Sequence, residues 1–173
     1  MKTEQYPIGK FDNGSPADAA ARTKYIRVLE ELPALLSGAV EYLDDFQLDT
    51  TYRKGGWKIR QVVHHIADSH INSFCRFKLA LTQEKPTICP YSEVLWAELD
   101  DSKIAPTASL NLIEGLHNRW VSLLRGMSDS DFERELFHPE SGNTNLGKML
   151  SYYDWHSRHH LAHITNTIKR ENW

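Results

Sequence analysis

The chain has 173 residues, of which 40% are hydrophobic and 25% charged, and its formal net charge is −3. This length and composition predict a single globular domain spanning residues 1–173, with enough apolar side chains for a sizeable core. The slight acidity gives no electrostatic reason to expect nucleic acid as a partner, and no apolar run reaches the 18 residues that a membrane span needs. The N-terminus lacks the apolar stretch of a signal peptide, and Cys75 and Cys89 form no close-spaced pair, so we expect a cytoplasmic protein.

The first predicted element is a long helix that follows an extended N-terminal segment, residues 1–14. The run Ser15-Pro16-Ala17-Asp18 is typical of a helix start, with a capping serine and a proline at the first helical position. The helical pattern continues to about Leu43, and Pro33 is expected to kink or divide it. Residues 44–56 are predicted to be a loop.

Three more long helices are predicted, because apolar side chains recur with helical spacing in each of them. Their approximate ranges are 59–81, 106–127 and 145–169, with short helices over 92–100, capped by Ser92, and after residue 128. Strand-like alternation does not persist anywhere. Four long helices with connections of mixed length predict an all-α fold, a four-helix bundle with short extra helices in the connections.

Nine histidines are present, and seven of them fall into two clusters. The first cluster, His64, His65 and His70, lies in the second long helix, and the second cluster lies in the last one. The second cluster contains two pairs with a spacing of four residues, His156 with His160 and His159 with His163. That spacing places both imidazoles of a pair on one face of a helix, which suits a single divalent ion.

Helical periodicity separates the two pairs. His156 and His160 lie at the edge of the apolar arc of the last helix, where they can face a partner helix across a pocket. His159 and His163 lie further round, so we expect them to face water or another subunit. The first pair is therefore the candidate metal site, while His70 is expected to be a packed core residue and His117 to have a structural role.

A third ligand has to come from the other cluster, where His64 and His65 lie at comparable angles on opposite sides of the apolar arc. Periodicity does not choose between them. A polar stripe runs along the His65 side of that helix over four turns and is a candidate pocket lining. It consists of Gln61, His65, Asp68, Ser69, Asn72 and Arg76.

Several segments, taken in order along the chain, resemble the YfiT-like branch of the DinB superfamily. They include Tyr6-Pro7-Ile8-Gly9, Gly55-Gly56-Trp57, the run from Arg60 to His70, Leu116-His117, His138-Pro139 and the run from Trp155 to Ile164. The resemblance implies a four-helix bundle in which three histidines bind a metal, one from the second long helix and two from the last. Carried over by motif, these ligands are His65, His156 and His160. The resemblance also implies a homodimer.

Three imidazoles leave an ion with its full charge and an open coordination position, which is the catalytic pattern rather than the structural one. A metal-dependent hydrolase is one hypothesis, a transferase of small thiols such as bacillithiol is a second, and a non-catalytic metal- or ligand-binding bundle is a third. Imidazoles suit Zn²⁺ and Ni²⁺ equally. Asp68 is the candidate catalytic base, and a small-molecule substrate would contact Asn72, Arg76 and Arg158.

Overall fold

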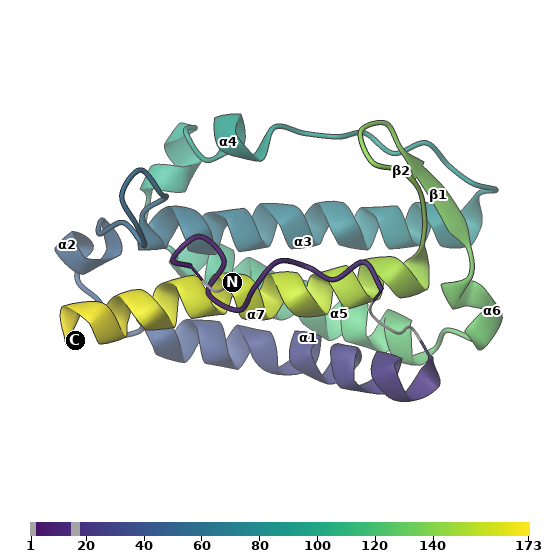
Figure 1. Cartoon of the computed structure of the whole chain (residues 1–173), viewed down its shortest axis with the longest axis horizontal. Helices are drawn as coiled ribbons and strands as arrows, with labels where there is room; N and C mark the ends of the chain where they lie inside the picture. Colours follow the sequence, from purple (N-terminus) through teal and green to yellow (C-terminus); the bar gives the residue numbers. More distant parts are fainter. Residues whose placement is uncertain (1–2, 15–17) are drawn as a thin grey trace.

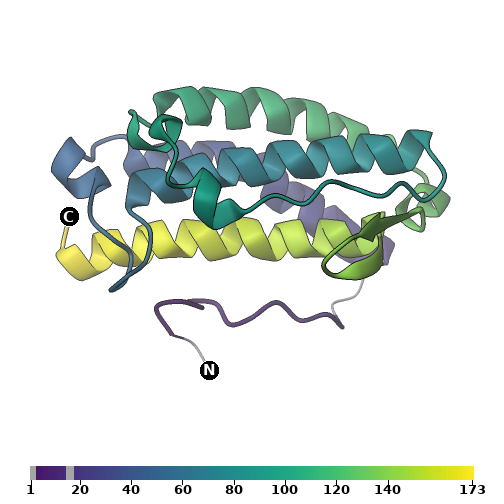
Figure 2. The same cartoon turned by 90° about the horizontal axis from the view of Figure 1, so that it is seen from above.

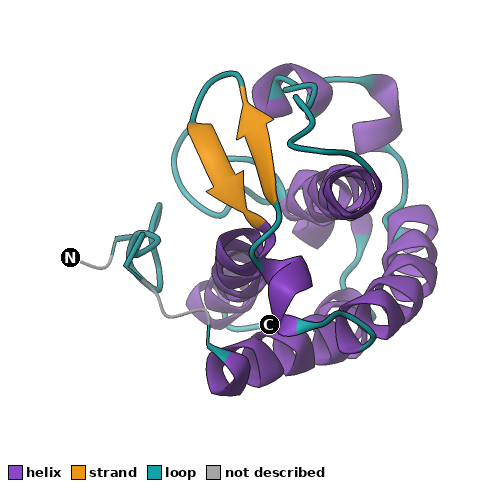
Figure 3. Ribbon diagram, turned by 90° about the vertical axis from the view of Figure 1, so that its right-hand side faces the viewer, coloured by secondary structure: helices purple, strands orange, loops and turns teal. Residues whose placement is uncertain are grey.

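The computed structural model describes residues 3–14 and 18–173 (Figure 1). Its frame consists of four long helices: α1 (Ala19–Val40), α3 (Ile59–Thr82), α5 (Thr107–Arg125) and α7 (Leu146–Glu171). Helices α1 and α3 each pack against both α5 and α7, so α1 and α3 occupy opposite corners (Figure 3). The predicted all-α bundle is thus confirmed, and α3 and α7 are neighbours.

Short elements lie in the connections between the long helices. They are α2 (Asp45–Leu48), α4 (Glu93–Trp96), the 3₁₀ helix η1 (Asp100–Lys103) and α6 (Asp129–Phe132). The prediction that residues 44–56 are all loop was wrong, because Asp44 and Gln47 form a reciprocal capping box that starts α2. The short helix predicted over residues 92–100 is capped by Ser92 as expected but ends at Trp96.

Helix α1 differs from its prediction at three points. Its cap is Asp18, whose carboxylate accepts the backbone N–H of Ala21 at 2.8 Å, whereas the cap predicted at Ser15 lies outside the described residues. It ends at Val40 rather than near Leu43. Pro33 does not divide it. A proline inside a helix leaves the carbonyl four residues earlier without its usual N–H partner, and here that carbonyl belongs to Leu29.

A two-stranded antiparallel hairpin corrects the prediction that no strand is present. Strand β1 (Glu135–His138) pairs with β2 (Gly142–Asn145), with Leu136 opposite Thr144. Each strand has only four residues and only Leu136 is fully buried, so the alternation is too short to recognise. Gly142, with φ of 81°, supplies the left-handed conformation at the turn. The hairpin lies beside one end of α3 and α7 (Figure 1).

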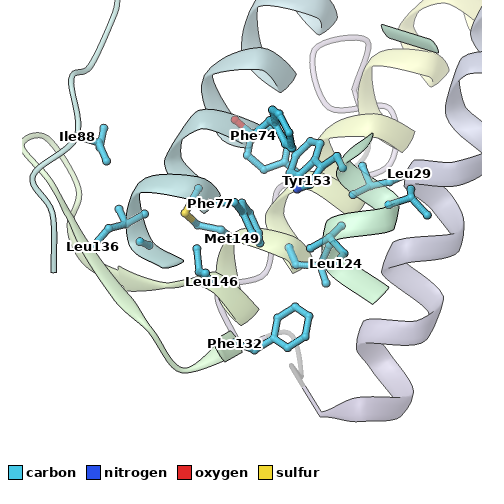
Figure 4. Packing of buried hydrophobic residues seen from close by; sticks show 14 residues of the cluster. Leu29, Phe74, Phe77, Ile88, Leu124, Phe132, Leu136, Leu146, Met149 and Tyr153 are labelled. Atoms are coloured by element: carbon cyan, nitrogen blue, oxygen red, sulfur yellow. The ribbon is translucent and has the colours of Figure 1, made fainter. Parts of the chain in front are cut away.

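Two apolar clusters fill the bundle, one toward each end. The cluster near the hairpin includes Phe77, Leu136, Leu146 and Tyr153 (Figure 4). The other, near α2, packs Ile59, Val63 and Leu36 with their neighbours. On α7 the four histidines lie between the residues of the two clusters, and on α3 His70 does, whereas His64 and His65 lie within the second cluster, next to Val63 and Ile66. Buried histidines therefore interrupt an otherwise apolar core.

The N-terminal segment, residues 3–14, runs along the outside of α7 (Figure 2). Its backbone carbonyl at Gly9 accepts the indole N–H of Trp155 at 3.1 Å. Phe11 packs edge-to-face against Tyr152, with ring centroids 5.2 Å apart. The segment therefore covers the outer face of the helix that carries four of the nine histidines. Among the described residues, no helix has the length and hydropathy of a membrane span.

Candidate metal centre

Helices α3 and α7 bring three imidazoles together in the middle of the bundle. The Nε2 atoms of His65 and His156 are 3.2 Å apart. The ring of His160 lies 4.7 Å from that of His65 and 4.4 Å from that of His156, measured between centroids. One nitrogen from each residue lies within 4.8 Å of the others, and all three side chains are buried.

This arrangement fits a divalent ion on geometric grounds. Nitrogens bound at 2.0–2.1 Å to a tetrahedral ion are about 3.3 Å apart, close to the separation of the two Nε2 atoms. Neutral imidazole nitrogens that approach this closely without a bridging proton repel each other through their lone pairs, and a shared cation removes that repulsion. The donor set, three nitrogens of borderline softness, suits Zn²⁺ and Ni²⁺.

The electrostatics of the cluster keep its imidazoles in the neutral form. Burial lowers the pKa of His65 to about 4, with a smaller contribution from the nearby His163. Burial likewise holds the pKa values of His156 and His160 well below the ordinary value for histidine. All three imidazoles are therefore neutral at pH 7, which is the form that ligates metal.

The structure separates His65 from its neighbour His64. The His64 ring turns toward the other side of α3, where its Nδ1 lies 2.8 Å from the hydroxyl of Ser109 and its Nε2 lies 3.2 Å from the carbonyl of Ile104. Those contacts connect α3 to α5 and to the segment that precedes α5. Of the two histidines, only His65 approaches α7.

His159 and His163 were expected to face water or another subunit, but they lie against other segments of the same chain. Both are buried, because the N-terminal segment and the loop before α3 cover that face of α7. His159 stacks on Trp155 with centroids 4.4 Å apart, and His163 stacks on Tyr52 at 3.9 Å. Periodicity located the pair correctly on the outer face of the helix but could not show what covers it.

His159, His160 and His163 form a second group whose nitrogens lie within 4.8 Å of one another. All three come from consecutive turns of α7, so no other helix contributes to this group. His160 belongs to both groups. The group with His65 joins two helices, and its member His156 lies in the wall of a cavity.

That cavity has a volume of about 790 Å³ and is lined by residues of α3, α7, the hairpin, the segment around α4 and the N-terminal segment. Its wall contains His156, Ser69, Arg76, three tyrosines, and charged side chains of both signs. The tyrosines are Tyr91, Tyr152 and Tyr153, and the other charged residues are Glu93, Glu140 and Lys148. The cavity therefore has room for a small molecule beside His156.

The predicted polar stripe lies only partly in this cavity. Arg76 is in the wall and donates to the carbonyl of Cys89 at 3.3 Å. Within the described part of the chain, Asp68, Asn72 and Arg158 are not in the wall. The Asn72 amide donates to the backbone carbonyl of Asp68, and Arg158 pairs with Asp154 one turn earlier.

Asp68 is half-buried on α3, and its pKa is raised to about 6. Burial is the larger cause, and repulsion from Asp101 is the smaller. A carboxyl group with that pKa exchanges a proton close to neutral pH, which is the property a general base needs.

Sequence reasoning missed most of the cavity wall. Tyr91, His138 and Glu140 lie in connections between the long helices, whose residues carry no periodic signal, and the hairpin that positions His138 was not expected. Sequence reasoning assigned His70 only to core packing and His117 only to a structural role. In the structure His117 is hydrogen-bonded to His70, and His70 is hydrogen-bonded to His156. Their position among apolar side chains was the available sign of this.

Comparison with known proteins places these features in a family. The sequence profile of the DinB superfamily matches residues 28–164. A protein of Oceanobacillus iheyensis named "Putative metal-dependent hydrolase" is 51% identical over 98% of this chain and 99% of its own length. A protein of Bacillus mycoides with the same description is 50% identical over the full length of both chains.

Solved structures agree with the sequence comparison. The structure of YfiT from Bacillus subtilis, described as a probable metal-dependent hydrolase with an unusual four-helix bundle topology, matches with a TM-score of 0.95. It is 50% identical and covers 98% of both chains. A mycothiol-dependent maleylpyruvate isomerase shares the fold at a TM-score of 0.59 and 17% identity, over 80% of this chain and 60% of its own. The chain therefore belongs to the DinB superfamily, in the branch that contains Bacillus subtilis YfiT.

Proposed function

We propose that this protein is a metal-dependent hydrolase of a small molecule, with a Zn²⁺ or Ni²⁺ ion held by His65, His156 and His160. The observation that carries the proposal is the position of three buried, neutral imidazoles beside a cavity of about 790 Å³ that one of them borders. The names of the relatives at about 50% identity support the reaction class.

When bound, a divalent ion supplies Lewis acidity, which activates water and polarises the bond to be cleaved. The protein's own groups bind and orient the substrate. Arg76 offers a cation in the cavity wall for a carboxylate or phosphate on the substrate. Burial raises the pKa values of Tyr91 and Tyr152, so both hydroxyls stay protonated at neutral pH and can donate to a substrate oxygen.

Proton transfer requires a base that is ionised near pH 7. We assign this role to Asp68, because its pKa of about 6 leaves the carboxylate mostly charged and still basic. Since Asp68 lies outside the described cavity wall, it would act on the substrate site through a water molecule. Asn72, next to it on α3, holds the backbone there by its bond to the carbonyl of Asp68 at 2.8 Å.

The charge of the cavity favours hydrolysis over transfer of an acidic thiol. Arg76 and Lys148 are balanced by Glu93 and Glu140 in the same wall, and Arg158 is neutralised by Asp154. A site for an anionic thiol cofactor would need a net positive lining. A non-catalytic binding role is disfavoured because His156 reaches the cavity.

The test is to load purified protein with Zn²⁺ or Ni²⁺, measure metal content, and assay a panel of ester and amide substrates. We expect one ion per chain, with hydrolysis that disappears on chelation and returns when metal is restored. A parallel assay with bacillithiol and an electrophile checks the thiol-transferase alternative. Thiol transfer without hydrolysis would overturn the proposed reaction, and protein that binds no metal would overturn the site.

A further inference from the structure

A row of hydrogen-bonded imidazoles connects the candidate metal centre to the backbone of α1. The Nδ1 of His156 lies 3.1 Å from Nε2 of His70, and the Nδ1 of His70 lies 2.8 Å from Nε2 of His117. The row ends where Nδ1 of His117 meets the backbone carbonyl of Leu29 at 2.5 Å. All three rings are buried, at 3% exposure or less.

A neutral imidazole has one N–H and one lone pair, so the terminal carbonyl decides the direction of every bond in the row. The carbonyl of Leu29 can only accept, which places the proton of His117 on Nδ1. Nε2 of His117 must then accept from Nδ1 of His70, and Nε2 of His70 must accept from Nδ1 of His156. His156 is left with its lone pair on Nε2, the nitrogen that faces His65.

Pro33 explains why the Leu29 carbonyl is available. In an uninterrupted helix this oxygen would accept the N–H of residue 33, but proline has none. His117 of α5 supplies the missing donor. The proline that seemed only to disturb α1 thus leaves one carbonyl inside the bundle for a side chain of another helix.

A shorter row reaches His160 from the opposite side. The Nε2 of His163 lies 3.2 Å from the backbone carbonyl of Gln5, in the N-terminal segment. The Nδ1 of His163 lies 3.3 Å from Nδ1 of His160. The same reasoning places the proton of His163 on Nε2 and that of His160 on Nδ1, which leaves Nε2 of His160 as its free nitrogen.

We propose that these two imidazole relays, each ending on a backbone carbonyl, hold His156 and His160 in the tautomer whose Nε2 lone pair is available to the metal. His70, His117 and His163 are then positioning residues, and the N-terminal segment contributes through the carbonyl of Gln5. The proposal rests on the metal site put forward above. Hydrogen bonds to the far nitrogen of a ligating imidazole commonly change metal affinity by about 10–100-fold.

The first experiment uses a matched pair of substitutions at His117 in the full-length protein. In His117→Gln, the amide can donate to the Leu29 carbonyl and its oxygen can accept from His70, so the direction of the relay is kept. In His117→Leu, both contacts are lost. Affinity for Zn²⁺ and for Ni²⁺ is measured by competition with a chromogenic chelator. We expect affinity about 10–100-fold weaker for His117→Leu and within about threefold of wild type for His117→Gln.

The same pair is made at His163, and His64→Leu serves as the control. His64 is also a buried histidine that contacts a carbonyl, but it lies outside both relays, so its loss should leave metal affinity unchanged. Equal weakening in all three leucine variants would mean a general effect of removing a buried histidine, and it would overturn the proposal. Circular dichroism checks that each variant keeps the helical content of the wild type.

A second measurement needs neither metal nor turnover. Long-range ¹H–¹⁵N spectra of the metal-free wild-type protein report which nitrogen of each imidazole carries the proton. We expect Nδ1–H at His70, His117, His156 and His160, and Nε2–H at His163. The opposite tautomer at His156 or His160 would overturn the relays. Protein that shows the expected tautomers but binds no metal would instead count against the proposed function alone.

Discussion

The two histidine pairs of α7 have the same spacing, lie on consecutive turns of one helix and are both buried, yet their surroundings differ. His156 and His160 face α3, where His65 completes a group of three at the edge of a cavity. His159 and His163 face the aromatic rings of Trp155 and Tyr52 beneath the N-terminal segment. The comparison teaches that a four-residue spacing places two imidazoles on one face of a helix, whereas the packing of other segments decides whether a third imidazole and a cavity lie opposite them.

The largest expected effect separates the two pairs directly. His156→Ala or His160→Ala should lose stoichiometric metal, because two imidazoles hold a divalent ion much less firmly than three. His159→Ala should keep about one ion per chain, because His159 belongs only to the alternative group. Elemental analysis of the purified variants provides the measurement. Loss of metal from His159→Ala with retention in His156→Ala would assign the ion to the group under the N-terminal segment.

A second expected effect concerns Asp68, which lies on α3, the helix that carries His65. Asp68→Asn should reduce turnover by about 100-fold while leaving metal content intact, because it removes a base but no ligand. In the wild type, activity should fall as pH drops through about 6, since protonation of the carboxylate removes the base. The pH–rate profile of both proteins checks this. An unchanged acidic limb in Asp68→Asn would assign that limb to another group.

The two candidate substrate-binding arginines give a smaller contrast. Arg76 lies in the cavity wall, whereas Arg158 is half-exposed and paired with Asp154 on the same helix. Arg76→Ala should therefore raise KM for an anionic substrate by about tenfold, the effect of roughly 1.4 kcal/mol of lost binding. Arg158→Ala should leave KM unchanged and alter stability by less than about 0.5 kcal/mol. Steady-state kinetics measures KM for both variants. A raised KM in Arg158→Ala would place the substrate on the outer face of α7.

The last expected effect appears in the stability of the metal-free protein and involves His65 together with the pair His159 and His163. Burial lowers the pKa values of His65, His159 and His163 to about 4, below the unfolded value of 6.5. As pH falls, these histidines therefore bind protons at a higher pH in the unfolded chain than in the folded protein. Stability is fully present above pH 6.5 and is lost toward pH 4, by up to about 1.4 kcal/mol per pH unit for each histidine.

Urea unfolding between pH 7 and pH 4.5 measures this loss. His159→Gln should flatten the dependence on pH, because the unfolded state of the variant binds one proton fewer in that range. A slope equal to that of the wild type would show that His159 is more accessible to water than its burial indicates.

The amino-acid sequence by itself determined the four long helices and the two histidine pairs, because both depend on the 3.6-residue period of a helix. It also indicated which pair lies nearer the apolar arc. It could not choose between His64 and His65 without the family resemblance, since the two lie at comparable angles on one helix.

Tertiary structure alone decided what each imidazole faces. His159 and His163 are buried because a segment more than 140 residues earlier in the chain folds over them, and no local pattern encodes that contact. His117 meets Leu29 and His70 only because α5 packs against both α1 and α3. Periodicity gives the face of a helix on which a residue lies, but the groups opposite that face come from distant parts of the chain, and they decide which imidazoles lie close together.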